Sequence, residues 1–145
     1  MLDSERVFCF IDTNIWLYAF VEADDPRKSS AARSLIQESE PHISTQVINE
    51  VCVNLLRKAG FSEERISELI ESFYDRYPAI ESNKLVLLEA SRLRQRYSLS
   101  FWDSTIVASA LAAGVSHLYS EDSQNGLSVN GRLTVLNPFA AHESG

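Results

Sequence analysis

Residues 7–14 read Val-Phe-Cys-Phe-Ile-Asp-Thr-Asn, and this stretch sets the fold class. Its first five residues are apolar with a β-branched residue at each end, a run too short for a helix. They predict a buried strand of a parallel sheet. Asp12, Thr13 and Asn14 then interrupt the run, and the apolar pattern resumes as a predicted helix over residues 15–21. A strand that leads through an acidic residue into a helix is typical of an α/β protein.

The alternation of strand and helix continues outward from this stretch. Helix-capping residues and periodic apolar residues predict further helices over residues 25–40, 44–59, 62–77, 82–97 and 102–113. Short apolar runs predict strands at 42–44, 78–80 and 115–120, and Asn130-Gly131 predicts a hairpin between 127–129 and 133–136. We therefore expect a three-layer α/β/α sandwich with a mainly parallel central sheet. Sites in such sheets lie at the carboxyl ends of the strands.

Composition narrows the class of protein. The chain has 145 residues, with 13 Lys or Arg against 20 Asp or Glu, so its formal net charge is −7. We expect one domain over residues 1–145, with about 140–145 as a tail. A domain that holds nucleic acid by bulk positive charge would be basic overall, so that class is excluded.

The two cysteines and the hydropathy pattern bear on location. Cys9 and Cys52 lie in apolar stretches, which favours buried free thiols and a reducing compartment. No stretch approaches the length of a membrane span, and no secretory signal is visible. We expect a cytoplasmic protein that does not interact with membranes.

Two acidic residues follow predicted strands. Asp12 ends the first strand, where an N-cap and an active-site residue are equally good interpretations. Asp122 follows the strand at 115–120, and the local sequence Ser-Gln-Asn-Gly after it also predicts an Asx turn.

Two further acidic residues lie on predicted helices. Asp103 is in line with the apolar stripe of its helix, so an inward-facing carboxylate there calls for a metal or a charged partner. Stabilisation by the helix dipole is the alternative. Glu50 lies about 150° from the centre of the apolar face of its helix, which by itself predicts a solvated side chain.

Four segments taken in order resemble the PIN-domain family, and especially its VapC-type ribonuclease toxins. They are Phe-Ile-Asp-Thr-Asn at 10–14, Ser-Thr-Gln-Val-Ile-Asn-Glu at 44–50, Trp-Asp-Ser-Thr-Ile-Val-Ala-Ser-Ala at 102–110, and Leu-Tyr-Ser-Glu-Asp at 118–122. The resemblance covers nearly the whole chain, and residues 131–139 resemble the family's last strand.

The resemblance implies a metal site for Mg²⁺ or Mn²⁺. Its ligands and catalytic residues would be the four acids Asp12, Glu50, Asp103 and Asp122. Three further residues would support these acids: Thr13, Asn14 and Ser120. It leaves Glu121 as a bystander or an auxiliary ligand. Carboxylates suit such hard cations, and a bound ion can activate water for phosphodiester hydrolysis. The implied activity is endonucleolytic RNA cleavage that leaves a 5′-phosphate and a 3′-hydroxyl. The implied partners are RNA, a cognate antitoxin and a second copy in a homodimer.

Candidate RNA contacts precede and adjoin Asp103. Arg92 and Arg96 share a helix face, and Trp102 offers a ring for base stacking, with Arg57 and Lys58 as further cations. A solvated helix face and core aromatics are the alternative interpretation. The histidines at 42, 117 and 142 have no required role, because metal-dependent hydrolysis needs no histidine base.

Two other functions stay open at this stage. One is a housekeeping PIN ribonuclease in RNA processing, and the other is a non-catalytic PIN-like binding module. Retention of all four acids argues against the second.

Overall fold

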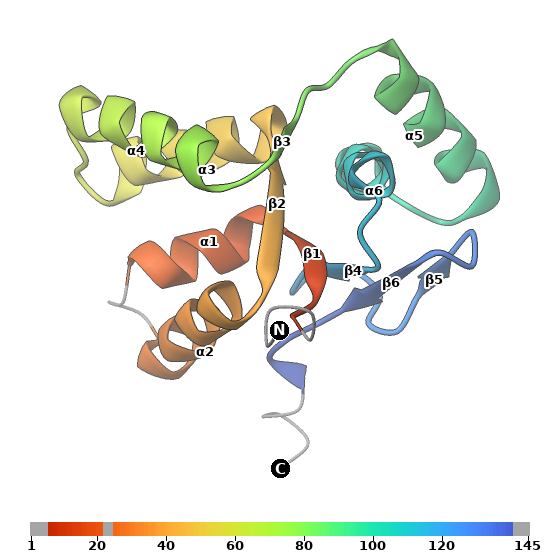
Figure 1. Ribbon diagram of the computed structural model, residues 1–145, viewed down its shortest axis with the longest axis horizontal. Coiled ribbons are helices and arrows are strands. Elements are labelled where there is room, and N and C mark those ends of the chain that lie inside the picture. The colour runs from red at the N-terminus through yellow and green to blue at the C-terminus, as the bar shows by residue number, and fades with distance from the viewer. Residues whose placement is uncertain (1–5, 22–24, 141–145) are drawn as a thin grey trace.

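The computed structural model describes residues 6–21 and 25–140, and within them six helices accompany a six-stranded sheet (Figure 1). The strands are β1 (Phe8–Ile11), β2 (Glu40–Ser44), β3 (Ala79–Ile80), β4 (His117–Tyr119), β5 (Ser128–Val129) and β6 (Leu133–Leu136). The helices are α1 (Thr13–Phe20), α2 (Pro26–Glu38), α3 (Thr45–Lys58), α4 (Glu63–Arg76), α5 (Lys84–Arg96) and α6 (Phe101–Ala113).

The sheet is parallel apart from one edge. Its strand order is β3-β2-β1-β4-β6-β5, and only the β5–β6 pair is antiparallel. In Figure 1, α1 to α4 lie on one side of β2, and α5 and α6 lie on the other. The expected α/β fold with a mainly parallel sheet is confirmed, and so is the hairpin at Asn130-Gly131, where both residues have positive φ.

Each helix begins where a capping side chain accepts a backbone N–H. The caps are Asp12, Asp25, Ser44, Ser62, Asn83 and Ser100. The first helix therefore begins at Thr13 rather than at the expected residue 15, because Asp12 already caps it. α6 ends at Gly114, whose φ of +75° suits a residue without a side chain.

A second predicted boundary is also wrong. The helix expected to reach about Glu40 ends at Glu38, and Glu40 and Pro41 belong to β2. Pro41 is tolerated there because that end of β2 pairs only with β1, opposite Cys9, whereas pairing with β3 begins at Ile43.

The burial of α6 also differs from the prediction. The sequence indicated a single apolar stripe, but all residues from 104 to 111 are buried. The cause is that α6 packs between the sheet and α5. Its polar residues remain satisfied because their hydroxyls bond to the helix itself; Ser109, for example, donates to the Thr105 carbonyl at 2.9 Å.

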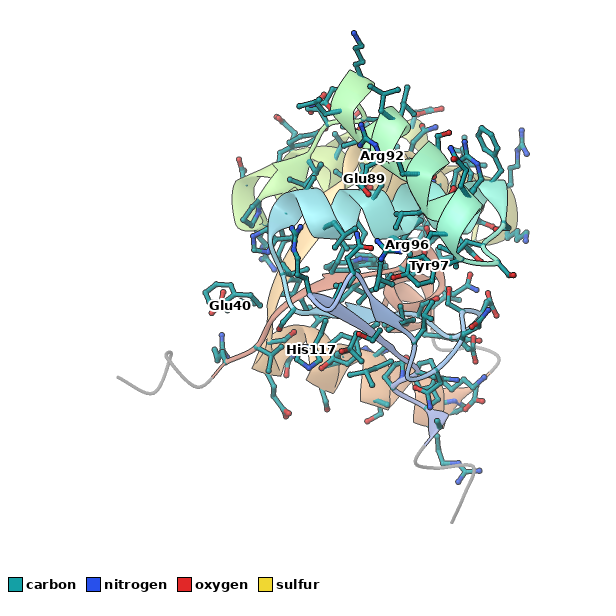
Figure 2. All side chains as sticks on the ribbon, turned by 90° about the vertical axis from the view of Figure 1, so that its right-hand side faces the viewer. Glu40, Glu89, Arg92, Arg96, Tyr97 and His117 are labelled. Atoms are coloured by element: carbon teal, nitrogen blue, oxygen red, sulfur yellow. The ribbon has the colours of Figure 1, made fainter. Side chains whose placement is uncertain are left out.

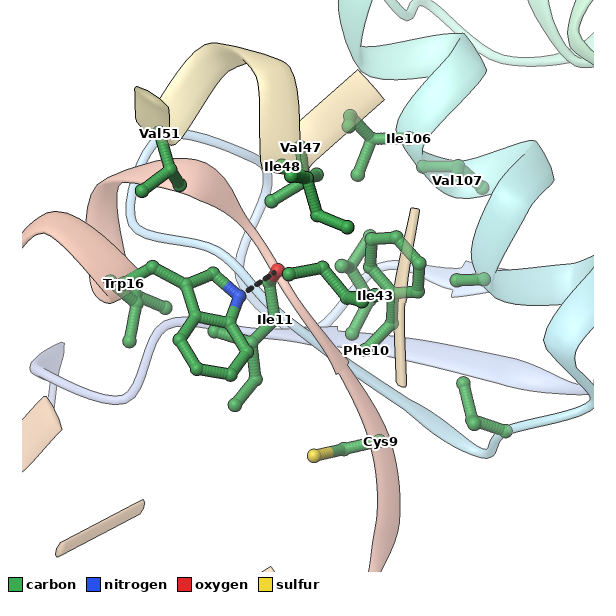
Figure 3. Packing of buried hydrophobic residues seen from close by; sticks show 14 of the residues in the cluster. Cys9, Phe10, Ile11, Trp16, Ile43, Val47, Ile48, Val51, Ile106 and Val107 are labelled. Atoms are coloured by element: carbon green, nitrogen blue, oxygen red, sulfur yellow. Dashed lines mark hydrogen bonds between the residues drawn. The ribbon is translucent and has the colours of Figure 1, made fainter. Parts of the chain in front are cut away.

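The core joins the sheet to both helical layers. Figure 3 shows Trp16 beside the end of β1, where its indole Nε1 donates to the Ile11 carbonyl at 3.0 Å. The same ring meets Phe73 and Tyr77 edge-on, each at a centroid distance of 5.2 Å. Trp16 therefore ties β1 to α4 through both a hydrogen bond and aromatic packing.

Cys9 and Cys52 are free and buried, as predicted. Burial raises the pKa of the Cys9 thiol to about 11 and also raises that of Cys52. Both thiols therefore stay protonated at neutral pH and act as small apolar residues. None of the helices in the described ranges combines the length and hydropathy needed to cross a bilayer. His142 and nearly all of the expected tail lie outside the described residues.

We predict that Trp16→Phe lowers the free energy of unfolding by about 1–3 kcal/mol, because the Ile11 carbonyl loses a buried donor and the packing loses one ring. Denaturant unfolding measures the change. Leu85→Ala is the control, since Leu85 is 74% exposed on α5 and its truncation should cost less than about 0.5 kcal/mol. Equal effects of the two substitutions would contradict the role given to Trp16.

Candidate functional site

The site begins where two neighbouring strands end. β1 and β4 are adjacent and parallel, so Asp12 and Ser120 follow their last residues at the same edge of the sheet. The Asp12 N–H donates to the Tyr119 carbonyl at 3.0 Å, which extends the pairing by one residue. The Ser120 hydroxyl then donates to Asp12 Oδ2 at 2.9 Å.

Asp12 is the N-cap of α1, one of the two roles that the sequence left open. Its Oδ1 accepts the Thr13 N–H at 2.7 Å, which caps α1. Burial raises the pKa of the Asp12 carboxyl above its ordinary value. The hydrogen bonds from Thr13 and Ser120 lower this pKa, and the charges of Asp103 and Asp122 raise it further. Two carboxylates from other parts of the chain therefore act on Asp12.

Asp122 is held at the site by a residue of the first helix. Asn14 Nδ2 donates to Asp122 Oδ2 at 2.8 Å, a contact between residues 108 positions apart. Asp122 itself is exposed, so the Asn14–Asp122 pair lies on the solvent side of the candidate site.

Glu121 points into a different set of contacts. Its Oε1 accepts the Tyr18 hydroxyl at 2.8 Å, and its Oε2 is bonded and ion-paired to Lys28 Nζ. The Lys28 ammonium also lies over the rings of Tyr18 and Phe139, at 5.3 and 5.4 Å from their centroids. Both carboxylate oxygens of Glu121 thus have partners. Glu121 and Asp122 are adjacent in sequence but contact different residues.

Asp103 lies in the first turn of α6 and is half-buried. It forms no ion pair within the described residues, and its charge acts on Asp12 instead. Its position also suits the helix dipole, so the two interpretations made from the sequence are compatible.

Glu50 is half-buried on α3 rather than fully solvated, and it lines a pocket with Trp102. Its charge is not among those that raise the pKa of Asp12. The charges of Asp103 and Asp122 therefore act on Asp12, whereas Glu50 lies on the wall of that pocket.

The donor set suits a hard divalent cation. Every candidate ligand offers carboxylate oxygen, the type preferred by Mg²⁺ and Mn²⁺, and a cation would relieve the repulsion that raises the pKa of Asp12. The buried Thr13 Oγ1 beside Asp12 makes no hydrogen bond in the described part of the chain, which leaves it as a spare polar group at the site. In residues 6–21 and 25–140 no three acidic, histidine or cysteine side chains form a ready-made metal cluster, so binding would have to draw the carboxylates together.

The two arginines expected to contact RNA also have partners within the protein. Figure 2 shows Arg92 beside Glu89 on α5, where Arg92 Nη1 lies 3.5 Å from Glu89 Oε1. Arg96 Nη1 donates to Asn130 Oδ1 at 3.2 Å, in the turn between β5 and β6. Neither arginine lines the pocket that contains Glu50 and Trp102.

Sequence reasoning missed the contacts of Tyr18 and Lys28. They meet Glu121 from 103 and 93 positions away, and no local pattern marks such a contact. It also passed over Gln46, although helical spacing places Gln46 on the same face of α3 as Glu50.

Comparison with known proteins identifies the family. Residues 9–127 match the PIN domain, whereas a search of curated proteins found no match. A toxin–antitoxin complex from Klebsiella pneumoniae has a TM-score of 0.68 and 19% identity over 90% of this chain and 97% of that one. VapC20 of Mycobacterium tuberculosis, a toxin that cleaves the sarcin–ricin loop, has a TM-score of 0.65 and 20% identity over 80% and 91%. FitAcB from Neisseria gonorrhoeae has a TM-score of 0.63 and 16% identity over 90% and 98%. At these identities the structures show a shared fold, and the match over residues 9–127 shows that the chain belongs to the PIN domain family.

Proposed function

We propose that this protein is an endoribonuclease that depends on Mg²⁺ or Mn²⁺ and acts as the toxin of a toxin–antitoxin pair. The observation that carries the proposal is the placement of Asp12 at the adjoining ends of β1 and β4, where Ser120 holds it, Asn14 holds Asp122, and the charges of Asp103 and Asp122 both act on Asp12. Like charges gathered around a partly buried carboxylate destabilise a fold, so their presence calls for a cationic ligand. The proposed metal-holding residues are Asp12, Asp103, Asp122 and, from the wall of the pocket, Glu50.

The residues around the carboxylates have distinct tasks in this proposal. When bound, the ion would offset charge on the phosphate and lower the pKa of an attacking water. Ser120 and the Thr13 N–H orient the two oxygens of Asp12, and Asn14 orients Asp122. The rigid strand end that carries Asp12 keeps its carboxylate fixed while the substrate enters.

Partners and substrate follow from the comparisons as proposals. The VapC20 toxin cleaves the sarcin–ricin loop, which supports structured RNA as the substrate class here. The K. pneumoniae complex pairs a toxin with an antitoxin, which supports a cognate antitoxin for this chain. The net charge of −7 favours an antitoxin segment with basic residues, since it would meet an acidic cleft. A homodimer in the cytoplasm is proposed on the family resemblance.

We predict that Asp12→Asn and Asp103→Asn each lower the rate of RNA cleavage by at least about 100-fold, because each removes a charge that the cation requires. Cleavage of a structured RNA by purified, antitoxin-free protein in Mn²⁺ measures the effect. Asp75→Asn, an exposed acid on α4, is the control and should cleave at the unaltered rate. If the unmodified protein cuts no RNA and the variants behave identically in cells, the proposed function is wrong.

We predict opposite effects of Asp12→Asn on stability with and without metal. In EDTA the variant should melt at a higher temperature than the unmodified protein, because a buried carboxylate with a raised pKa is replaced by a neutral amide. Mn²⁺ at about 100 times its Kd should stabilise the unmodified protein by about 2.7 kcal/mol and the variant by much less. Thermal unfolding at pH 7 measures both. A variant that gains as much from Mn²⁺ as the unmodified protein would exclude Asp12 as a ligand.

We predict that substitutions of the adjacent acids Glu121 and Asp122 separate stability from activity. Glu121→Gln should lower the free energy of unfolding by about 1–3 kcal/mol, since the ion pair with Lys28 loses its charge. Its cleavage rate under native conditions should stay within about threefold. Asp122→Asn should abolish cleavage with little effect on stability. The reverse pattern would assign the ligand role to Glu121.

A further inference from the structure

A pocket lies between α3 and the start of α6, and Glu50 is the one lining residue to which the hydrolysis proposed above gives a role. It encloses about 360 Å³, within the range of pockets that hold small organic ligands, and Glu50 borders it. Apart from the apolar Val53, its other lining residues are polar, cationic or aromatic: Gln46, Asn49, Asn54, Arg57, Lys58 and Trp102.

Trp102 provides the aromatic wall of this pocket. Its side chain is 46% exposed, whereas Trp16, the other tryptophan, is 2% exposed. Trp102 directly precedes Asp103 in the sequence. Its ring lines the pocket together with Glu50. An exposed indole at that place offers a flat apolar face on which a nucleobase can stack.

The side of the pocket formed by α3 is polar at one end of the helix and cationic at the other. Gln46 and Asn49 lie in its first half, and Arg57 and Lys58 lie in its last turn. The Gln46 amide nitrogen is buried and has no hydrogen-bond partner among the described residues. Arg57 and Lys58 form no ion pair in that same part of the chain. One end of the wall can therefore bond to the edge of a base, and the other can bind phosphate.

A second pocket of about 240 Å³ continues this surface toward the carboxylates. It shares Asn54 and Lys58 with the first pocket, and its lining includes Asn14, the residue that donates to Asp122. The two pockets are therefore contiguous along α3, and one polynucleotide strand can lie in both.

We propose that the pocket between α3 and Trp102 is a subsite for one unpaired RNA nucleotide next to the cleaved phosphodiester, and that it selects the base. The base stacks on Trp102 with Gln46 and Asn49 at its edge, and Arg57 and Lys58 bind the adjacent phosphate. This inference rests on the proposed nuclease function and names the part of the substrate that the carboxylates do not recognise.

Tryptophan fluorescence tests the subsite without catalysis, because Trp102 is exposed and Trp16 is not. The full-length protein in EDTA is titrated with single-stranded RNA pentamers of each base. We expect saturable quenching that differs in affinity among the four pentamers and is absent from Trp102→Phe, in which only Trp16 emits. A duplex of the same length should quench weakly, because its bases stay stacked. Equal quenching by duplex and single strand, or quenching that persists in Trp102→Phe, would overturn the proposal.

Binding measured by anisotropy of labelled RNA completes the test. Trp102→Leu should weaken binding roughly 5- to 150-fold, the range for loss of one stacked base, and Trp102→Phe should recover most of it. Phe101→Leu is the matched control, because Phe101 is also exposed but packs under Arg94, whose Cζ lies 4.0 Å from the ring centroid. Arg57→Gln should lessen the salt dependence of binding, and Lys84→Gln on α5 should not. Unaltered binding by Trp102→Leu, in a protein that still cleaves RNA, would reject the subsite and leave the nuclease function standing.

Discussion

The buried carboxylate of Asp12 is the constraint on which the rest of the site depends. It lies where β1 ends and α1 begins, and it needs donors for both of its oxygens. The Thr13 N–H supplies one from the helix, and the Ser120 hydroxyl supplies the other from the neighbouring strand end. The pairing of β1 with β4 is therefore both a structural element and the means of fixing a charge at the edge of the sheet. Any ligand of that charge must approach along the same edge.

The negative charge gathered around Asp12 destabilises the fold, and contacts made by the neighbouring acidic residues limit that destabilisation. Asp103 stays half-buried at a helix N-terminus, where the dipole favours an anion, and Asp122 stays exposed and bonded to Asn14. Glu121 contacts Tyr18 and Lys28 instead of these aspartates. The Tyr18 hydrogen bond and the Lys28 ion pair hold the segment after β4 against α1 and α2, so these contacts stabilise the fold beside Asp122.

Helix α3 shows why periodicity alone misjudged one residue. Glu50 lies away from the apolar face of α3, and for an isolated helix that face is solvated. In the folded protein Trp102 from α6 lies across from it, so Glu50 lines a pocket instead. Periodicity describes which residues face the core, but a hollow between two elements depends on where the second element lies. The full burial of α6 escaped prediction for the same reason, since α5 covers the face that the sheet does not.

The class of fold and the positions of most helices and strands could be predicted from the amino-acid sequence alone. Those features follow from signals within a few residues of each other: capping side chains, apolar periodicity, and the hairpin dipeptide at Asn130-Gly131. The candidate acids were predicted from the resemblance to the PIN-domain family, because the local sequence left Asp12 and Asp122 with two interpretations each. Only the tertiary structure decided which oxygens Asn14 and Ser120 reach, that Glu121 is bound elsewhere, and that Arg92 and Arg96 are paired within α5 and with the hairpin. Such contacts join residues as far apart as 108 positions, and their geometry depends on strand order and helix packing rather than on any local preference.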